Sequence, residues 1–392
     1  MCRVVKALYG LHESPRVWND EISAFMKREG LHRSLSDPSV YVNNAGEVQM
    51  MLITGLWVDD LVIATKHDKT LKRFKKAISG TYRMIDKGMM TWCLGMSVKQ
   101  DATGIELNQA AYIDKILQRF SMADAKPAPT PFPSGVQLSD EQSPQTDQER
   151  EEMQKVPYRQ AVGALIHLIT CTRPDVAFHV GQLARYSANP GRAHWQALKH
   201  LLRYLAATKQ LSIRYTRNDP DGDKLTDLVL TGYVDASWGS ETDDRKSVTG
   251  YIMTLAGGPV AWMSKRQSIT AQSTAEAEYV AASSATSEVL YLRKLLSELG
   301  MPQMSATTVF EDNQPCIQIA NNPGTSARTK HIALRYHAVR ERVANGEVKL
   351  VYVPTEDQVA DLLTKSVGRV ILQRLRPVLM GHQVPLQVCM NV

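Results

Sequence analysis

Three aspartates in the C-terminal half occupy positions where a carboxylate is unusual. Asp235 lies inside the run Y-V-D-A-S. Asp312 comes at the end of a predicted strand, in V-F-E-D-N, and Asp361 is flanked by apolar residues in V-A-D-L-L-T-K. β-propensity and burial both disfavour a carboxylate inside a strand, so its charge has to be compensated. A single such residue is commonly a helix cap, but three at the ends of neighbouring elements predict a shared acidic site.

A fourth acid is expected from a long helix predicted over residues 274–299, where Glu276 and Glu278 are both candidates. Helical spacing from Glu276 leads along a mixed face through Ser283 and Lys294, which suits an exposed or first-turn carboxylate. Helical spacing from Glu278 leads along an apolar face that has to pack on a sheet. This face comprises Ala281, Ala282, Ala285, Val289, Leu292 and Leu296. Glu278 is therefore preferred, and Glu276 remains the alternate acid.

Four carboxylates that lie close together cannot all ionise unless cations lie among them. Mg²⁺ suits such a site because it takes oxygen ligands and keeps waters and substrate phosphates, with Mn²⁺ as the alternative ion. Two such ions about 4 Å apart activate a water and stabilise the leaving oxygen in phosphodiester cleavage. The sequence thus predicts metal-dependent phosphodiester hydrolysis, with Asp235, Glu278, Asp312 and Asp361 as both catalytic and metal-binding residues.

The elements that must position these acids follow one another from residue 227 onward. Three successive strands are predicted in L-V-L-T-G-Y-V-D-A-S, S-V-T-G-Y-I-M-T-L-A-G and P-V-A-W-M-S-K-R-Q, separated by turn-forming stretches. After the long helix come a strand, a short helix, a helix through residues 332–343, a strand and a final helix after Pro354 that carries Asp361. The predicted order is β-β-β-α-β-α-α-β-α.

The N-terminal half contains a second acidic pair, Asp59 and Asp60, between two apolar runs that are predicted as strands. Adjacent acids at such a tip often do no more than form a turn. A basic amphipathic helix is predicted over 69–82, and further helices over 158–186 and 193–208. Six of the 18 prolines fall between residues 123 and 157, which predicts an extended, solvated linker that divides the chain.

The composition excludes several classes of protein. With 43% hydrophobic and 22% charged residues, the chain is neither wholly disordered nor collagenous. It has no apolar run of membrane-spanning length and no signal-type start, so we expect an intracellular protein, cytoplasmic or nuclear, without a membrane partner. The five cysteines form no CxxC pair, which argues against a zinc ribbon. The net charge of +6 is only weak support for a polyanionic partner.

Several motifs, in order, resemble the ribonuclease H domain of copia-type retrotransposon polyproteins: D-A-S-W, S-T-A-E-A-E-Y, E-D-N-Q, K-H-I-A-L-R-Y-H and V-P-T-E-D-Q-V-A-D-L-L-T-K. The resemblance implies an α/β (α+β) fold with a three-layer RNase H-like domain built on a mixed five-stranded sheet. It also implies two Mg²⁺ ions and cleavage of the RNA strand of RNA–DNA hybrids, with Asp235, Glu278, Asp312 and Asp361 as the four acids. The loop V-P-T-E-D-Q has no histidine where related ribonucleases H often carry one.

Upstream, W-V-D-D, K-A-L-Y-G-L-H-E-S-P-R-V-W and L-N-Q-A-A-Y-I-D-K-I-L resemble the reverse transcriptase of the same family. Family polymerases need a third aspartate that precedes the K-A-L-Y-G-L segment. Because this sequence begins at that segment, we expect Asp59 and Asp60 to be relics of a polymerase site. We also expect no autonomous DNA synthesis from this chain. The expected parts are a truncated palm and thumb (1–122), a Pro-rich linker (123–157), a helical connector (158–226), an RNase H-like domain (227–367) and a C-terminal tail (368–392).

Contacts with the hybrid are expected from two polar stretches near the acids, because phosphates position a nucleic acid and its 2′-OH distinguishes RNA. The candidates are Lys265, Arg266, Gln267, Arg328, Lys330, His331 and His337. Other retroelement proteins are further potential partners. Two alternatives to the ribonuclease remain open: a catalytically silent remnant that at most binds nucleic acid, and a fragment of a full, active polyprotein.

Overall fold

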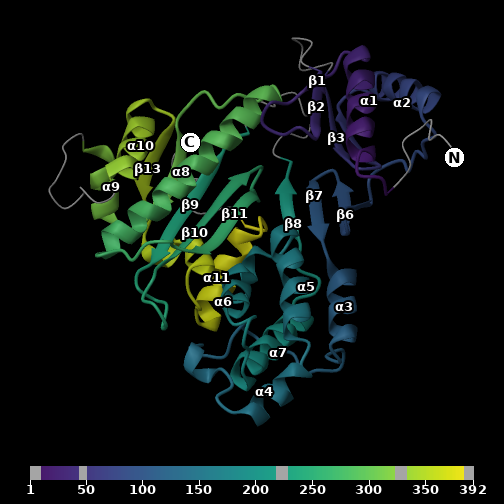
Figure 1. The fold of residues 1–392 in the computed structure, drawn as a ribbon. Coiled ribbons are helices and arrows are strands. Elements are labelled where there is room, and N and C mark those ends of the chain that lie inside the picture. Colours follow the sequence, from purple (N-terminus) through teal and green to yellow (C-terminus); the bar gives the residue numbers. More distant parts are fainter. Residues whose placement is uncertain (1–9, 44–50, 218–227, 323–332, 384–392) are drawn as a thin grey trace. The chain divides into compact units, whose positions relative to one another are not determined.

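The structure is a computed structural model that describes residues 10–43, 51–217, 228–322 and 333–383 (Figure 1). The chain divides into two compact units. The first comprises residues 1–90 with 225–227 and 290–304, and the second comprises residues 91–224, 228–289 and 305–392. No helix in the described ranges combines the length and the apolar character needed to cross a bilayer.

The first unit contains an antiparallel sheet in the order β1-β2-β3-β4. Its strands are β1 (His32–Arg33), β2 (Val40–Asn43), β3 (Leu52–Trp57) and β4 (Asp60–Thr65). Helices α1 (Ser14–Arg28) and α2 (Asp68–Thr81) belong to the same unit. Phe25, Phe74 and Ile78 from the helices and Leu52 from the sheet are buried in one apolar core. The two strands predicted around the acidic pair are thus β3 and β4, and the predicted basic helix is α2.

The second unit begins with an antiparallel sheet in the order β5-β6-β7-β8. Its strands are β5 (Trp92–Cys93), β6 (Met96–Asp101), β7 (Gly104–Asn108) and β8 (Ile213–Thr216). The chain between β7 and β8 forms α3 (Ala110–Arg119), α4 (Asp147–Gln154), α5 (Tyr158–Cys171), α6 (Ala177–Arg185) and α7 (Arg192–Ala207). Pro174 opens a 3₁₀ turn between α5 and α6, and Pro190 precedes α7, so both prolines end a helical stretch as predicted.

The proline-rich segment is not the solvated linker that its composition predicts. Ala128, Phe132 and Leu138 are buried in the same apolar core as α5 and α7. The backbone N–H of Ala128 donates to the carbonyl of Arg203 in α7 at 3.2 Å. Composition predicted solvation from proline and charge, but the few apolar side chains between the prolines bury enough surface to fix the segment on the helices. The segment lies within the second unit, and the boundary between the units falls at residue 90 instead.

A five-stranded mixed sheet in the order β11-β10-β9-β12-β13 positions the acidic residues. Its strands are β9 (Thr231–Ser237), β10 (Val248–Leu255), β11 (Gly258–Arg266), β12 (Thr307–Glu311) and β13 (Val348–Tyr352). The first three strands form an antiparallel meander, and β12 runs parallel to both β9 and β13. The connecting helices are α8 (Thr274–Glu298), α9 (Gln314–Asn321) and α10 (Ala333–Ala344). This order and mixed pairing match the predicted RNase H-like fold.

Two layers cover opposite faces of this sheet, and neighbouring residues of β10 show which layer lies on which face. Tyr251 donates its hydroxyl to Glu288 of α8 at 3.0 Å. A Cβ on Gly250, on the other face, would lie 2.8 Å from the Cβ of Leu363 and 2.6 Å from Thr364. Successive side chains of a strand point to opposite faces. Helix α8 therefore covers one face (Figure 1), and the 3₁₀ turn η7 (Val359–Leu363) covers the other.

The C-terminal part differs from the prediction in two ways. Asp361 lies in the 3₁₀ turn η7 and not in the predicted final α-helix. The last α-helix, α11, begins further along the chain and spans Arg369–Leu379. Residues after 367 were predicted to be a tail, yet Leu372, Leu375 and Leu379 of α11 are buried in the core. Helical spacing of these leucines places them on one face, which shares an apolar core with α5, α6 and α7.

Candidate active site

Asp235 is fixed on the η7 face of the central strand β9. It pairs with Gly250 in the ladder between β9 and β10, and residues that pair directly share a face of the sheet. Gly250 is required there because any side chain would collide with Leu363 and Thr364. This absence of a side chain lets η7 approach the sheet closely. The Thr364 hydroxyl then donates a hydrogen bond to Oδ2 of Asp235.

Asp312 and Glu311 come at the carboxyl end of β12. The ladder between β9 and β12 pairs Phe310 with Tyr233, so its continuation by two residues brings Asp312 beside Asp235. Glu311, one residue earlier, points to the opposite face, where α8 lies. Glu311 is fully buried, and its Oε1 accepts the backbone N–H of Asn313 at 3.0 Å.

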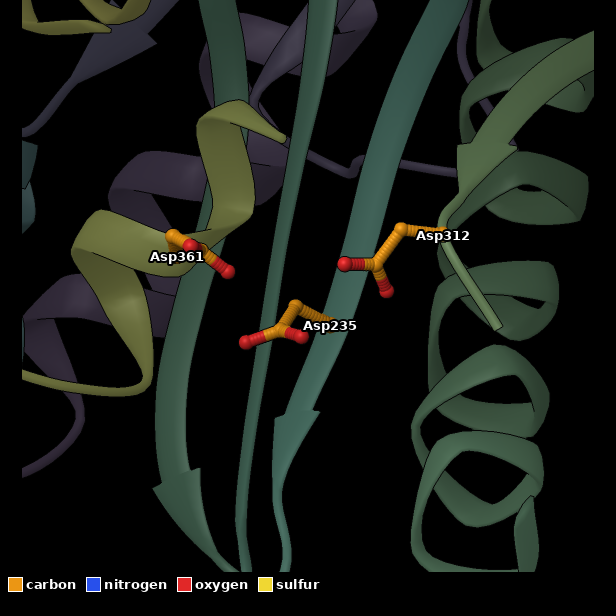
Figure 2. Close-up of side chains that lie close together, drawn as sticks. All are labelled: Asp235, Asp312 and Asp361. Atoms are coloured by element: carbon orange, nitrogen blue, oxygen red, sulfur yellow. The ribbon is translucent and has the colours of Figure 1, made fainter. Parts of the chain in front are cut away.

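Asp361 reaches the cluster from η7, and Figure 2 shows its side chain beside Asp235, with Asp312 across from them. Nζ of Lys365 lies 2.7 Å from Oδ1 of Asp361 and 3.9 Å from Oδ2 of Asp235. Burial alone would lower the pKa of Lys365, but the charges of Asp235 and Asp361 outweigh it and raise that pKa. Lys365 therefore stays a cation that partly neutralises these two carboxylates.

The structure separates the two glutamates of α8. Glu278 is buried with 3% of its surface exposed, on the face that packs on the sheet. Glu276 is only half buried, and its Oε2 accepts the backbone N–H of Gln272 at 2.8 Å, which is a contact of the helix N-terminus. Glu278 thus lies with the other acids and Glu276 does not.

The acids form two groups that share one residue. Asp235, Asp312 and Asp361 form the first, and Glu278, Glu311 and Asp312 form the second. Within each group, one oxygen from every side chain lies within 4.8 Å of the others. Asp312, at the end of its strand, is common to both. The sequence analysis did not predict Glu311, although its place one residue before Asp312 in a strand is a signal that it faces the long helix.

Burial dominates the electrostatics of this cluster. Burial and the charge of Asp235 raise the pKa of Asp361 to about 7, against the opposing effect of Lys365. Burial and the neighbouring carboxylates raise the pKa of Glu278 and the pKa of Glu311 well above their usual range. Burial also raises the pKa of Asp235. Without added positive charge, several of these groups hold protons near neutral pH.

The residues present fit divalent cations. All ligand atoms offered are carboxylate oxygens, the donors that hard divalent ions prefer. Oε2 of Glu278 is buried without a hydrogen-bond partner among the described residues, which is costly unless another ligand is bound. Asp312 is placed to contact an ion in either group.

We expect the metal-free protein to lose stability as the pH rises from about 4 to about 7. The pKa of Asp361 is raised in the folded state, to about 7. The folded state therefore binds more protons than the unfolded state in this window, and deprotonation on raising the pH favours unfolding. The expected decrease in the free energy of unfolding is on the order of 4 kcal/mol, because the pKa differs by about three units between the two states.

Urea unfolding across this pH range, with chelator or with saturating Mg²⁺, measures the effect. Bound cations favour the deprotonated carboxylates, so the decrease should vanish with Mg²⁺. The Asp361→Asn variant is the matched control and should show a shallower pH dependence without metal. Equal pH profiles for the two proteins would contradict the assignment.

The acidic pair of the first unit has a different setting. Asp59 and Asp60 are exposed at the turn between β3 and β4, and Nε1 of Trp18 donates to the carbonyl of Val58 in this turn at 2.9 Å. The side chain of Trp57 is 62% exposed. Asp59 and Asp60 therefore belong to a well-defined hairpin tip, and their role as relics of a polymerase site stays a prediction.

The residues predicted to contact nucleic acid divide into three groups. Lys265 is exposed, and Arg266 is bound to Asp244 at 2.6 Å while 42% of its side chain remains exposed. Gln267 is buried, and its Nε2 donates to the carbonyl of Ala277 at 2.9 Å, so it joins β11 to α8 and is not available to a ligand. The remaining predictions, Arg328, Lys330 and His331 and the side chain of His337, lie outside the described residues.

The topology and the acidic cluster define an RNase H-like domain, which follows a reverse-transcriptase-like part. A family model described as reverse transcriptase (RNA-dependent DNA polymerase) matches residues 1–134. The retrovirus-related Pol polyprotein from transposon TNT 1-94 of Nicotiana tabacum is 39% identical over 94% of this chain and 27% of that relative. The corresponding polyprotein from transposon RE2 of Arabidopsis thaliana is 34% identical over 95% of this chain and 24% of the relative.

A shorter relative matches over most of its own length. A putative transposon Ty5-1 protein of Saccharomyces cerevisiae is 30% identical over 72% of this chain and 87% of the relative. The chain therefore belongs to the family of copia-type retrotransposon Pol polyproteins, as its motifs predicted. It spans about a quarter of the length of the two plant polyproteins.

Among solved structures, LC11 ribonuclease H1 isolated from compost is similar, with 16% identity and a TM-score of 0.29, over 35% of this chain and 93% of that one. Ribonuclease H1 of Halobacterium salinarum has 16% identity and a TM-score of 0.25, over 34% and 93% of the two chains. At such TM-scores the likeness adds nothing to the topology described above.

Proposed function

We propose that this chain hydrolyses the RNA strand of RNA–DNA hybrids, with two Mg²⁺ ions held by Asp235, Glu278, Asp312 and Asp361. The observation that carries the proposal is the pair of carboxylate groups that share Asp312. Two separate sets of oxygen ligands with one common member suit two cations better than one. Glu311 adds a further carboxylate on the side of Glu278.

The residues of the chain have distinct tasks in this reaction. Asp235 is oriented by the Thr364 hydroxyl, so its carboxylate is fixed before substrate binds. Lys365 neutralises Asp361 and Asp235 in the free protein and reduces their repulsion. When bound, the metal ions supply an activated water and stabilise the leaving oxygen of the phosphodiester. The 2′-OH of the cleaved strand is the group by which RNA differs from DNA.

The test is cleavage of hybrids labelled on the RNA strand or on the DNA strand, with and without Mg²⁺. We expect cleavage of the RNA strand only, dependent on the metal. Binding without cleavage would contradict the proposal and favour a silent nucleic-acid-binding remnant.

A matched pair of variants tests the acid that α8 contributes. Glu278→Gln is expected to lower the rate of cleavage by about a hundredfold or more, because a ligand of the second carboxylate group is lost. Glu276→Gln removes the same charge two residues away, outside the cluster, and should cleave at nearly the wild-type rate. The reverse ranking of the two variants would overturn the choice of Glu278.

A further inference from the structure

Two cavities flank the proline-rich segment of the second unit. One has a volume of about 550 Å³ and lies between this segment, α6 and the residues that follow η7. The other has a volume of about 700 Å³ and lies between the segment and α7. Both are lined by Gly135, Val136, Gln137 and Leu138, so a single stretch of backbone separates them.

The first cavity reaches the candidate active site. Thr364 and Lys365 line it, and the same residues contact Asp235 and Asp361. A chain-like ligand whose reacting group lies at the carboxylates could therefore continue into this cavity without leaving the surface of the protein.

The charged side chains that line the two cavities are all basic, and one of them, Lys365, is also paired with Asp361 at 2.7 Å. Lys365 and Arg369 line the first, and Lys199 and Arg203 line the second together with His200, whose pKa is lowered by burial and by the charge of Arg203. No aspartate or glutamate occurs among the lining residues of either cavity. Hydroxyl and amide side chains such as Ser134, Gln137 and Gln182 complete the first cavity. Basic and neutral hydrogen-bonding groups without acids are the set that contacts the sugar–phosphate backbone of nucleic acids.

The dividing segment is held in place from α7. Nε2 of His200 lies 3.1 Å from the carbonyl of Thr130, and Nε of Arg203 donates to the carbonyl of Lys126 at 2.6 Å. The side chains of Phe132, which precedes the stretch that separates the cavities, and of Leu138, which ends it, are buried. The cavities are therefore preformed, and a ligand would not have to order the segment.

We propose that these two cavities form a track for the sugar–phosphate backbone of one strand of the RNA–DNA hybrid, running from the acidic cluster across the proline-rich segment to α7. The inference rests on the proposed ribonuclease function and extends its substrate site to Arg369 and Lys199. It assigns a role in substrate binding to a segment whose composition predicts only a linker.

Hybrid binding in Ca²⁺, which allows binding to be measured apart from cleavage, tests the track. Lys199→Gln and Arg369→Gln are each expected to raise the dissociation constant several-fold. Each should also reduce the slope of log affinity against log salt by about one, because one phosphate contact is lost. Lys99→Gln, an exposed lysine of β6 that lines neither cavity, is the matched control and should bind like wild type.

Substrate length gives a second measurement. With a short hybrid that fills only the acidic cluster, the two track variants should lose less affinity than with a long hybrid, and a urea unfolding midpoint equal to that of wild type would show that they fold. Binding and salt slopes equal to those of Lys99→Gln on a long hybrid would overturn the track. If wild type binds the hybrid without cleaving it, the ribonuclease proposal fails while the effect of the track variants on binding can still be measured.

Discussion

Replacement of Asp312 by asparagine is expected to reduce hybrid cleavage at least about a thousandfold, because Asp312 is the one residue common to both carboxylate groups. Loss of its charge weakens the ligand set for both ions, whereas loss of Asp361 or Glu278 affects one group. The substitution keeps the size of the side chain. It also removes one negative charge from a crowded cluster, so the metal-free variant should be at least as stable as wild type.

The measurement is a comparison of initial cleavage rates at saturating Mg²⁺, together with the unfolding midpoint in chelator. Asp124→Asn is the control, since Asp124 is an exposed aspartate of the same unit outside the cluster. A variant that cleaves at the wild-type rate, or that loses activity only because it unfolds, would contradict the shared role of Asp312.

The second large effect is expected at a buried ion pair in the connector. Arg173 donates from Nε and Nη2 to the two carboxylate oxygens of Asp175, each at 2.8 Å, and both side chains are buried. The Tyr204 hydroxyl donates to Asp175 at 2.8 Å, and Arg376 of α11 donates to the same hydroxyl at 2.9 Å. This network joins α7 to α11 beneath the RNase H-like sheet.

Asp175→Asn is expected to lower the free energy of unfolding by about 3–5 kcal/mol, because it leaves the buried Arg173 guanidinium without a counter-charge. Burial alone would raise the pKa of Asp175, but the charge and hydrogen bonds of Arg173 outweigh it and hold that pKa below its usual value. The aspartate is therefore charged across the neutral range, and its replacement removes a full ionic partner.

Urea unfolding of Asp175→Asn against Asp114→Asn measures the effect. Asp114 pairs with Lys209 at 3.1 Å, but 46% and 42% of the two side chains are exposed. Exposed pairs contribute about 0–1 kcal/mol, so the control should stay close to wild type. An equal decrease in the free energy of unfolding in the two variants would contradict the expected effect of burying the ion pair between Arg173 and Asp175.

The sequence by itself determined the elements that carry the acids. Alternating and continuous apolar runs predicted β9, β10, β11, β12 and β13 in order, and the apolar face of α8 selected Glu278 over Glu276 before any contact was known. These predictions succeed because burial of apolar side chains leaves a period of two in strands and about 3.6 in helices. Ordered motifs then predicted the polyprotein family, which the comparisons confirm.

Tertiary structure decided which side chains share a site. Glu311 meets Glu278 because a strand sends neighbouring residues to opposite faces, and only the packing of α8 gives that face a partner. Asp361 lies in a 3₁₀ turn that Gly250 allows to approach the sheet. The proline-rich segment packs into the core although its composition predicted a linker, and α11 packs there although a C-terminal tail was expected. The positions of these residues and segments depend on contacts between residues that are distant in the sequence. Local composition and periodicity do not predict such contacts.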